Sequence, residues 1–200
     1  MDIINRVKQI LVAPKPEWQI IDGENDSSVT VLTKYVLLLA AIPAIASFIG
    51  YGVIGYSVLG YKVASISVGI MKAITMYITM VGGAYLTAFI IDLLAPNFGS
   101  QKNFDKAFSL VAYAYTPAFI GGIFYIIPSL GFLAGLASLY SLYLLYIGLT
   151  PMMKTTDEKR TTYFVVSLLI MVAAFFTLSL VLGAILAAII IGGAAAYGGL

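Results

Sequence analysis

The sequence contains no cysteine and no histidine. These absences exclude disulfides, thiolate or imidazole metal sites, and nucleophiles activated by histidine. Charged residues are also scarce, at 10% of 200 residues, whereas about a quarter of the residues in a soluble domain are charged. The net charge of +2 is too small to suggest nucleic acid as a partner. The composition thus argues against thiol chemistry, nucleic-acid binding and a soluble fold.

In place of charge, the sequence has long uncharged apolar runs, at residues 35–61, 73–91, 107–153 and 161–200. About 20 apolar residues cross the hydrocarbon core of a bilayer, so the first two runs hold one span each and the third holds two. The last run fits one long span with a frayed tail better than a hairpin, because it has no polar turn. We therefore predict an all-α integral membrane bundle of five transmembrane helices in a domain at 35–200, with spans at about 35–55, 69–93, 106–127, 129–149 and 162–190.

Residues 1–34 are predicted to form a short cytoplasmic region with an amphipathic helix. Apolar residues recur there at helical spacing, and the polar residues Asp2, Asn5, Arg6, Lys8 and Gln9 take the other face. This pattern is typical of a helix that lies on the membrane surface, and Pro14 and Pro16 are expected to end it. Trp18, the only tryptophan, is then expected to anchor the chain among the headgroups. The alternative is a short solvated helix without lipid contact.

The distribution of positive residues predicts the orientation of the spans. With five spans, the N-terminal region, the 95–105 loop and the 150–161 loop lie on one side of the membrane. That side holds nine of the eleven basic residues, and the other holds Lys62 and Lys72. The bias predicts a cytoplasmic N-terminus and an external C-terminus.

Two ionisable residues lie in or near the second span. Lys72 and Asp92 are 20 residues apart, which is about 30 Å along a helix and matches the hydrocarbon thickness. Charges within a membrane are functional candidates by default, but this spacing favours one residue at each interface. Asp92 is also a candidate to pair with Lys102 or Lys106.

The third and fourth spans carry the other candidate residues. Tyr113, Tyr115 and Thr116 precede Pro117, which breaks the helical hydrogen-bond ladder, and two glycines follow it. Such a segment could line a cavity, but we favour a packing joint. In the fourth span, Tyr140 and Tyr143 are expected to donate hydrogen bonds to the third span, with the Tyr113 carbonyl freed by the proline as one acceptor.

Three stretches together resemble the Yip-domain family, named for Ypt/Rab-interacting proteins. They are PKPEWQIID before the first span, LVAYAYTPAFIGGI in the third and YSLYLLYIGLTPMMK at the end of the fourth. The resemblance implies a five-helix membrane domain and eukaryotic relatives that bind Rab-type GTPases and one another in vesicle traffic. It implies no catalytic residues and no cofactor. Only about 34 residues precede the first span, so the chain resembles a prokaryotic member in the cytoplasmic membrane, which argues against carrying over the GTPase partner.

Three functions remain open at this point. The first is a non-enzymatic scaffold or adaptor that shapes the bilayer or binds other membrane proteins or a second copy of itself. The second is a transporter or channel for a small solute or lipid, with its path between the third and fourth spans. A membrane enzyme is the least supported, since Asp92 has no acid–base partner in its own span. A continuous polar cavity between the third and fourth spans would favour transport, and a closed bundle would favour the scaffold.

Overall fold

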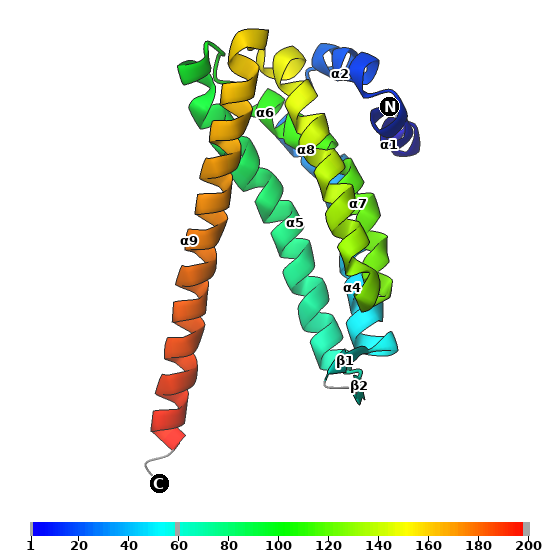
Figure 1. The fold of residues 1–200 in the computed structure, drawn as a ribbon, viewed down its shortest axis with the longest axis vertical. Helices are drawn as coiled ribbons and strands as arrows, with labels where there is room; N and C mark the ends of the chain where they lie inside the picture. The colour runs from blue at the N-terminus through cyan, green and yellow to red at the C-terminus, as the bar shows by residue number, and fades with distance from the viewer. Residues whose placement is uncertain (1, 59–60, 198–200) are drawn as a thin grey trace.

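The structure is a computed structural model that describes residues 2–58 and 61–197. Five helical segments in the described residues are long and apolar enough to cross a membrane, and two short helices precede them (Figure 1). The predicted all-α class with five spans is confirmed. The five segments are Ser28–Ile54, Ile66–Phe98, Phe104–Ile126, Pro128–Met153 and Asp157–Thr177.

Several of these segments are compound. In chain order the elements are α1 (Ile3–Val12), α2 (Pro14–Gly23), α3 (Ser28–Val31), the π-helical η1 (Leu32–Val36), α4 (Leu37–Phe48), the π-helical η2 (Ile49–Ile54), β1 (Tyr56–Val58), β2 (Tyr61–Val63), α5 (Ile66–Leu94), η3 (Ala95–Phe98), α6 (Phe104–Ala114), α7 (Thr116–Gly121), η4 (Gly122–Ile126), η5 (Pro128–Leu130), α8 (Gly131–Met153) and α9 (Asp157–Tyr197). The strands β1 and β2 form a small antiparallel hairpin that the sequence analysis does not anticipate.

The two N-terminal helices differ from the prediction in how they meet. Asp2 caps α1, since its carboxylate accepts a hydrogen bond from the N–H of Ile4 at 3.4 Å. The helix ends at Val12, and Pro14 is the first residue of α2. A proline is well suited to that position because the N–H it lacks would have no partner in a first helical turn. The first helix therefore ends before Pro14 as predicted, and the prolines also begin a second helix, which was not predicted.

The first span begins earlier than its charge pattern suggests. Ser27 caps it, because its hydroxyl accepts from the N–H of Thr30 at 3.2 Å. Lys34 lies within the helix with an exposed side chain, so its long stem can carry the charge away from the apolar core. A lysine therefore does not mark the start of this helix, and the boundary lies at Ser28 and not near residue 35.

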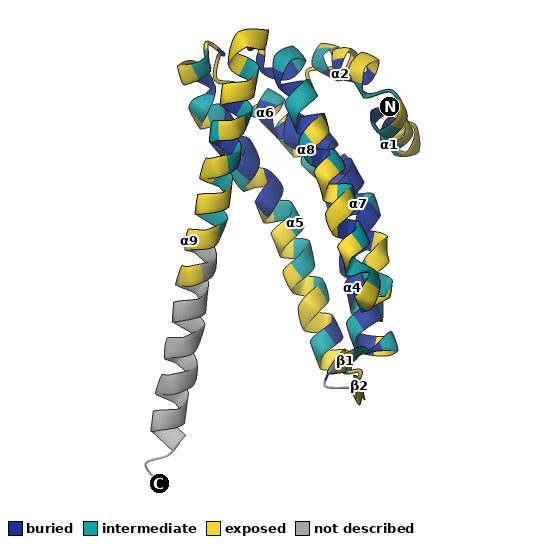
Figure 2. Ribbon diagram, in the orientation of Figure 1, coloured by how far each residue is buried: buried dark blue, intermediate teal, exposed yellow. Residues whose placement is uncertain are grey.

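The third span forms the centre of the bundle. Of its apolar window, 72% is buried within the protein, against 11% for the fifth span. In α6 every residue from 107 to 114 is buried, and α6 packs against α5 on one side and α8 on the other (Figure 2). Ser109 and Tyr113, which lie in this stretch, therefore face protein and not lipid.

The glycine pair after Pro117 is a packing joint. A Cβ atom added to Gly121 would lie 2.4 Å from the Cβ of Ala137 in α8. One added to Gly122 would lie 2.4 Å from the Cβ of Pro43 in α4. Both distances are far below van der Waals contact, so only glycine lets the third span approach the first and fourth spans this closely. The packing interpretation of the segment is therefore the one the geometry supports.

The last helix, α9, runs without interruption from Asp157 to Tyr197, so the hairpin alternative is wrong. It packs on α5, η3 and α8 near its start and then diverges from them (Figure 1). Large apolar side chains along its described part are exposed, among them Leu169, Val172 and Phe176 (Figure 2). The fifth span therefore joins the bundle at one end only.

Candidate functional site

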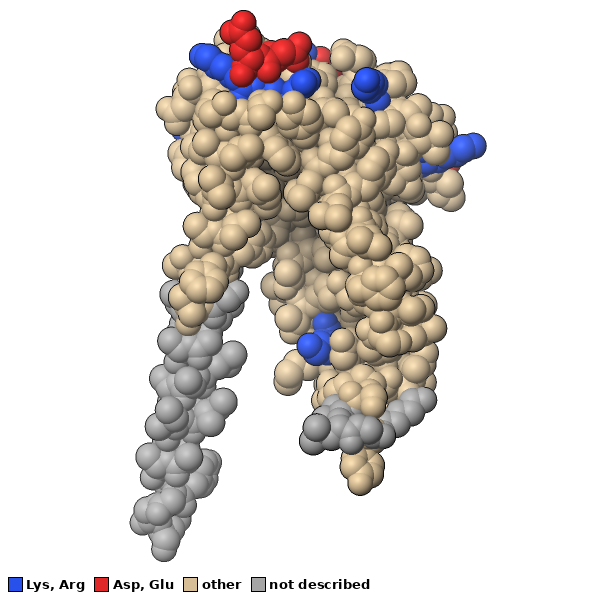
Figure 3. Space-filling view, viewed as in Figure 1, with Lys and Arg blue, Asp and Glu red and all other residues tan. Residues whose placement is uncertain are grey.

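The polar end of the molecule is where its charged side chains meet. Lys, Arg, Asp and Glu residues gather over the start of α9 and the N-terminal helices, and most of the remaining surface on this face is uncharged (Figure 3). The N-terminal helices and the loops before α6 and α9 share this end, because Asp22 of α2 binds both Lys106 of α6 and Lys154 at the end of α8. This end of the molecule is therefore the first candidate for a site that binds a polar or charged ligand.

Arg6 is the centre of a buried ion-pair network. Its guanidinium binds Glu17 of α2 and, through the other terminal nitrogen, Glu24 just beyond α2. The side chains of Arg6 and Glu17 are each only 4% exposed. The guanidinium also lies 5.2 Å from the ring centroid of Tyr113, within cation–π range. The network fixes α1 to α2 and both helices to the third span.

This arrangement corrects the predicted amphipathic face of α1. Arg6 was expected on the polar side, but it is buried together with Ile10, whereas Ile4 is 74% exposed. Ile3, Val7 and Leu11 pack against the protein core. Most of the apolar stripe of α1 therefore covers the bundle, and a carboxylate pair in α2 and its C-cap compensates the arginine in that stripe.

Trp18 is a core residue and not a headgroup anchor. Its side chain is 1% exposed and packs on α8 at Gly148. A Cβ atom at position 148 would lie 2.7 Å from Cε2 of Trp18 and 2.5 Å from Cδ1 of Leu110. The indole occupies the space that this glycine leaves open, so α2 is seated directly on the fourth span.

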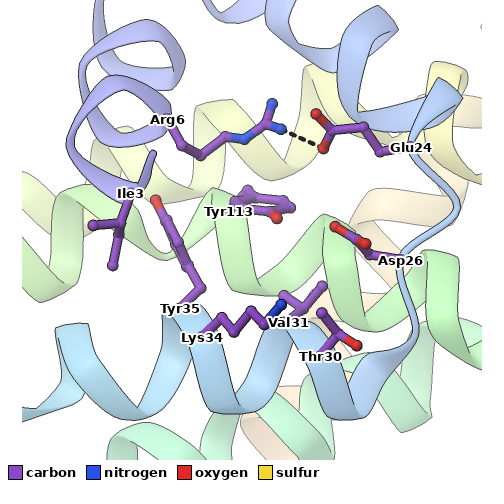
Figure 4. A pocket seen from close by; sticks show the side chains of 9 residues that line it. All are labelled: Ile3, Arg6, Glu24, Asp26, Thr30, Val31, Lys34, Tyr35 and Tyr113. Atoms are coloured by element: carbon purple, nitrogen blue, oxygen red, sulfur yellow. Dashed lines mark hydrogen bonds and ion pairs between the residues drawn. The ribbon is translucent and has the colours of Figure 1, made fainter. Parts of the chain in front are cut away.

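A cavity of about 140 Å³ opens between α1, the start of the first span and α6. Figure 4 shows Arg6 and Glu24 across its upper part, with the rings of Tyr35 and Tyr113 between them and Lys34. The Tyr35 hydroxyl shares a 2.6 Å hydrogen bond with Thr116, and the Tyr35 and Tyr113 rings meet edge to face at 4.7 Å. With Asp26 also in its lining, the cavity holds two basic and two acidic residues, so it has no net charge.

The residues around Pro117 bond within the bundle. Thr116, whose side chain is fully buried, donates its hydroxyl to the carbonyl of Tyr113 at 2.6 Å. This carbonyl is the one that the proline deprives of its helical donor, so the residue before the proline satisfies it and not a tyrosine of the fourth span. The fourth span contributes Ser141, whose hydroxyl accepts from the N–H of Ala118 at 3.2 Å.

Tyr115 ties three spans together. Its hydroxyl lies 2.8 Å from the hydroxyl of Thr87 in α5, and the Thr87 hydroxyl lies 3.0 Å from the sulfur of Met171 in α9. Because the hydroxyls of Tyr115 and Thr87 bond to each other, they offer few hydrogen-bonding groups to a solute. The contact joins the second, third and fifth spans at the point where α9 is still attached to the bundle.

Tyr140 and Tyr143 do not bond to the third span. The Tyr140 hydroxyl donates to the carbonyl of Leu11 at the end of α1, at 2.9 Å. Tyr143 stacks on Tyr140 with ring centroids 5.6 Å apart and is 44% exposed. Tyr140 thus satisfies a carbonyl of the last turn of α1, which has no helical donor. The sequence could not indicate this partner, because the N-terminal helix was expected on the lipid.

Lys72 and Asp92 lie near opposite ends of α5 and do not meet. The Lys72 ammonium lies 5.2 Å from the ring centroid of Tyr51. Asp92 has one buried carboxylate oxygen without a hydrogen-bond partner in the described residues. Asp92 was a candidate to pair with Lys102 or Lys106, and neither ion pair forms among the described residues. Lys106 instead binds the carboxylate and the backbone carbonyl of Asp22.

Asp22 is the acceptor that sequence reasoning missed. Burial alone would raise the pKa of this carboxyl, but the hydrogen bond and charge of Lys154, and then those of Lys106, hold its pKa below the ordinary value. Its partners lie in α6 and beyond α8, so nothing in the local sequence indicates them. Within the described residues, no three acidic residues lie together as metal ligands.

Comparison with known proteins agrees with this architecture. Residues 8–180 match the Yip1 domain. The chain is also 29% identical over 117 residues to the inner membrane protein YohC of Escherichia coli strain K12 and to its counterpart in strain O6:H1. These matches cover 58% of this chain and 60% of the relatives, so less than two thirds of the curated relatives' length is represented.

No solved structure matches the chain. The Yip1 domain match nonetheless includes α2, all of the first four spans and the part of α9 that packs on the bundle. The resemblance seen in the sequence is therefore confirmed over most of the chain. This integral membrane protein belongs to the Yip1 domain family.

Proposed function

We propose that the protein is a non-enzymatic membrane scaffold or adaptor, and that it binds another membrane protein, or a second copy of itself, along α9. The observation that carries the proposal is the divergence of α9 from α5 and α8. The described part of α9 presents Leu169, Val172 and Phe176, exposed by 63%, 59% and 65%. Figure 3 shows the molecule hollowed between this helix and the rest of the bundle.

The other wall of the hollow, α5, is also apolar. Its side chains include Ile74 and Ile78, exposed by 55% and 64%. A Cβ atom added to Gly82 of α5 would meet nothing within 4 Å. Small residues that face open space let the backbone of another helix come close, and close packing is what holds helices together in lipid. These features support a protein occupant over lipid chains alone.

Photo-crosslinking in native membranes tests this proposal. We expect a photoreactive amino acid at Val172 to give a discrete protein adduct, because that position is one of the exposed apolar residues of α9. The matched control is Leu136 of α8, which is equally apolar and 57% exposed. Co-expression of two differently tagged copies distinguishes a second copy from a different protein. Lipid adducts alone at position 172 would contradict the proposal.

Transport is the second candidate, and one observation favours it. The third span is discontinuous, since α6 ends at Ala114 and α7 begins at Thr116. Broken helices form substrate sites in many transporters. Here, however, the freed carbonyl of Tyr113 and the N–H of Ala118 are bonded to Thr116 and Ser141. Because the polar atoms at the break are paired within the bundle, we rank transport below the scaffold.

We also propose that the charged end faces the cytoplasm. The bias of nine basic residues against two supports this orientation. We expect topology reporters fused after Leu200 and inserted in the 155–157 loop to report opposite sides of the membrane. A reporter in the β1–β2 hairpin, at positions 59–60, serves as the control and should agree with the Leu200 fusion. Agreement between the Leu200 and 155–157 reporters would contradict the five-span topology.

A further inference from the structure

A second cavity, the basic cavity, lies on the charged end between α2, the loop before α6 and the end of α8. Its volume is about 340 Å³, and its lining includes Lys102, Lys106, Lys154 and Asp22. Three lysines against one aspartate leave two positive charges without a compensating carboxylate in the lining. This cavity differs from the neutral one beside Arg6, and its charge points to an anion.

The lysines are not equally occupied. Lys106 donates to the backbone carbonyl of Asp22 and lies 3.4 Å from its carboxylate, and Lys154 binds the same carboxylate at 2.5 Å. Lys102, in contrast, is exposed and makes no ion pair among the described residues. Asp22 therefore holds two ammonium groups beside the cavity. The ammonium group of Lys102 is not paired with a carboxylate in the described residues, so its charge is available to bind an anion.

A buried hydroxyl gives an independent indication of a ligand. Ser100 lines the basic cavity and is only 6% exposed, yet its hydroxyl oxygen has no hydrogen-bond partner in the part of the chain that the structure describes. A buried polar group is normally paired, and leaving one unpaired destabilises a protein. The start of α6 also lies in the lining, at Asn103, and the N-terminal end of a helix attracts negative charge. A phosphate oxygen would satisfy both features.

The floor of the cavity indicates where such a phosphate would come from. Met152 and Met153 close the inner side, and they are 3% and 2% exposed. They form the last turn of the fourth span, so the cavity lies at the depth where the span leaves the hydrocarbon. A lipid headgroup reaches this place with its acyl chains already in the bilayer, whereas a soluble phosphate has to bind by charge alone.

We propose that the basic cavity binds the phosphate group of an anionic phospholipid, with Lys102, Lys154 and Ser100 as the contacting residues. Lys106 keeps Asp22 in place, and Asp22 in turn positions Lys154 at the rim. The lipid would then bridge α2, the loop before α6 and the end of α8. This inference does not depend on what occupies the hollow beside α9.

Native mass spectrometry of the purified full chain in a neutral detergent tests the proposal by counting bound lipids. The probes are phosphatidylglycerol and phosphatidylcholine, which carry the same phosphate but differ in net charge. We expect phosphatidylglycerol to bind more tightly, and Lys102→Gln to weaken its binding about fivefold, equivalent to about 1 kcal/mol for one basic residue near an anionic lipid. Ser100→Ala, which changes no charge, should weaken binding about threefold through the lost hydrogen bond.

Lys8→Gln is the matched control, because Lys8 is an exposed lysine on α1 outside the cavity. Equal losses for Lys8→Gln and Lys102→Gln would mean general attraction to anionic lipid and would overturn the site. Displacement of phosphatidylglycerol by millimolar inorganic phosphate would overturn the lipid as the ligand. The unfolding temperatures of the two lysine variants without added lipid should stay at the wild-type value, since Lys102 and Lys8 make no ion pairs among the described residues. Ser100→Ala removes an unpaired buried hydroxyl, so its unfolding temperature without lipid should be no lower than that of the wild type.

Discussion

Replacing Arg6 with alanine is expected to lower the free energy of unfolding by about 3–5 kcal/mol, the usual cost of removing one partner from a buried ion pair. Glu17 would be left buried without a counter-charge, because its side chain is 4% exposed and its only ion pair in the described residues is with Arg6. Glu24 would lose the same partner, but its side chain is 31% exposed and can reach water. The main effect should be release of α1 and α2 from the bundle.

The absence of cysteine allows a clean measurement of that release. Ser109 of α6 is 4% exposed and lines the same small cavity as Ile21 and Glu24, so Ser109→Cys should react with a maleimide only when α2 moves away from α6. We expect Arg6→Ala to accelerate labelling strongly. Lys8→Ala, which removes an exposed charge from the same helix, should leave the labelling rate and stability unchanged.

The double variant Arg6→Met/Glu17→Met tests whether an unpaired buried charge causes the loss of stability. An apolar pair of similar volume often replaces a buried ion pair at little cost, so much of the lost stability should return. If Arg6→Ala loses less than about 1 kcal/mol, the network does not hold the N-terminal helices in place. If the double variant is as unstable as Arg6→Ala, the charge imbalance is not the cause.

Gly148→Ala is expected to destabilise the protein by about 1–3 kcal/mol through overpacking. The new methyl group would lie 2.5 Å from Leu110 and 2.7 Å from the indole of Trp18, and the rigid indole can yield only if α2 moves. The measurement is the free energy of unfolding in detergent, together with the labelling rate of Ser109→Cys.

Gly135→Ala is the matched control on the same helix. A Cβ atom at position 135 meets nothing within 4 Å, so this change should be neutral or stabilising by up to about 1 kcal/mol. Equal effects at positions 148 and 135 would show that α2 is not seated on α8 as described. A larger loss at 148 alone would confirm that Trp18 requires the glycine.

The spans could be predicted because each depends on a local property. Charge-free length is visible in the sequence, and it identified the membrane-spanning helices without any knowledge of their neighbours. Span ends were less predictable, because the first span carries Lys34 within its helix. The lysine stem can extend past the apolar region, so charge alone locates a boundary only to within a few residues.

The partners of the N-terminal helices could not be predicted, because they depend on distant residues. An isolated tryptophan after two prolines has the same local pattern whether it faces headgroups or packs on Gly148. The sequence pattern likewise assigns Arg6 to the polar face of α1, and only the structure shows that Glu17 and Glu24 pair with it inside the protein. Thr116 is different, since a hydroxyl directly before a proline commonly bonds to a carbonyl of the preceding turn. That contact was within reach of sequence reasoning.

The seating of α1 and α2 on the fourth span also constrains the order of biosynthesis. Leu11 and Tyr140 are separated by 129 residues, and Asp22 and Lys154 by 132. At typical elongation rates the surface of α8 is therefore made on the order of ten seconds after the helices that bind it. During that interval the apolar stripe of α1 is uncovered, and the adjacent bilayer is the nearest surface that can accept it. We therefore expect the membrane-surface helix that the sequence pattern predicts to form in the nascent chain, and to leave the bilayer when the fourth span is made.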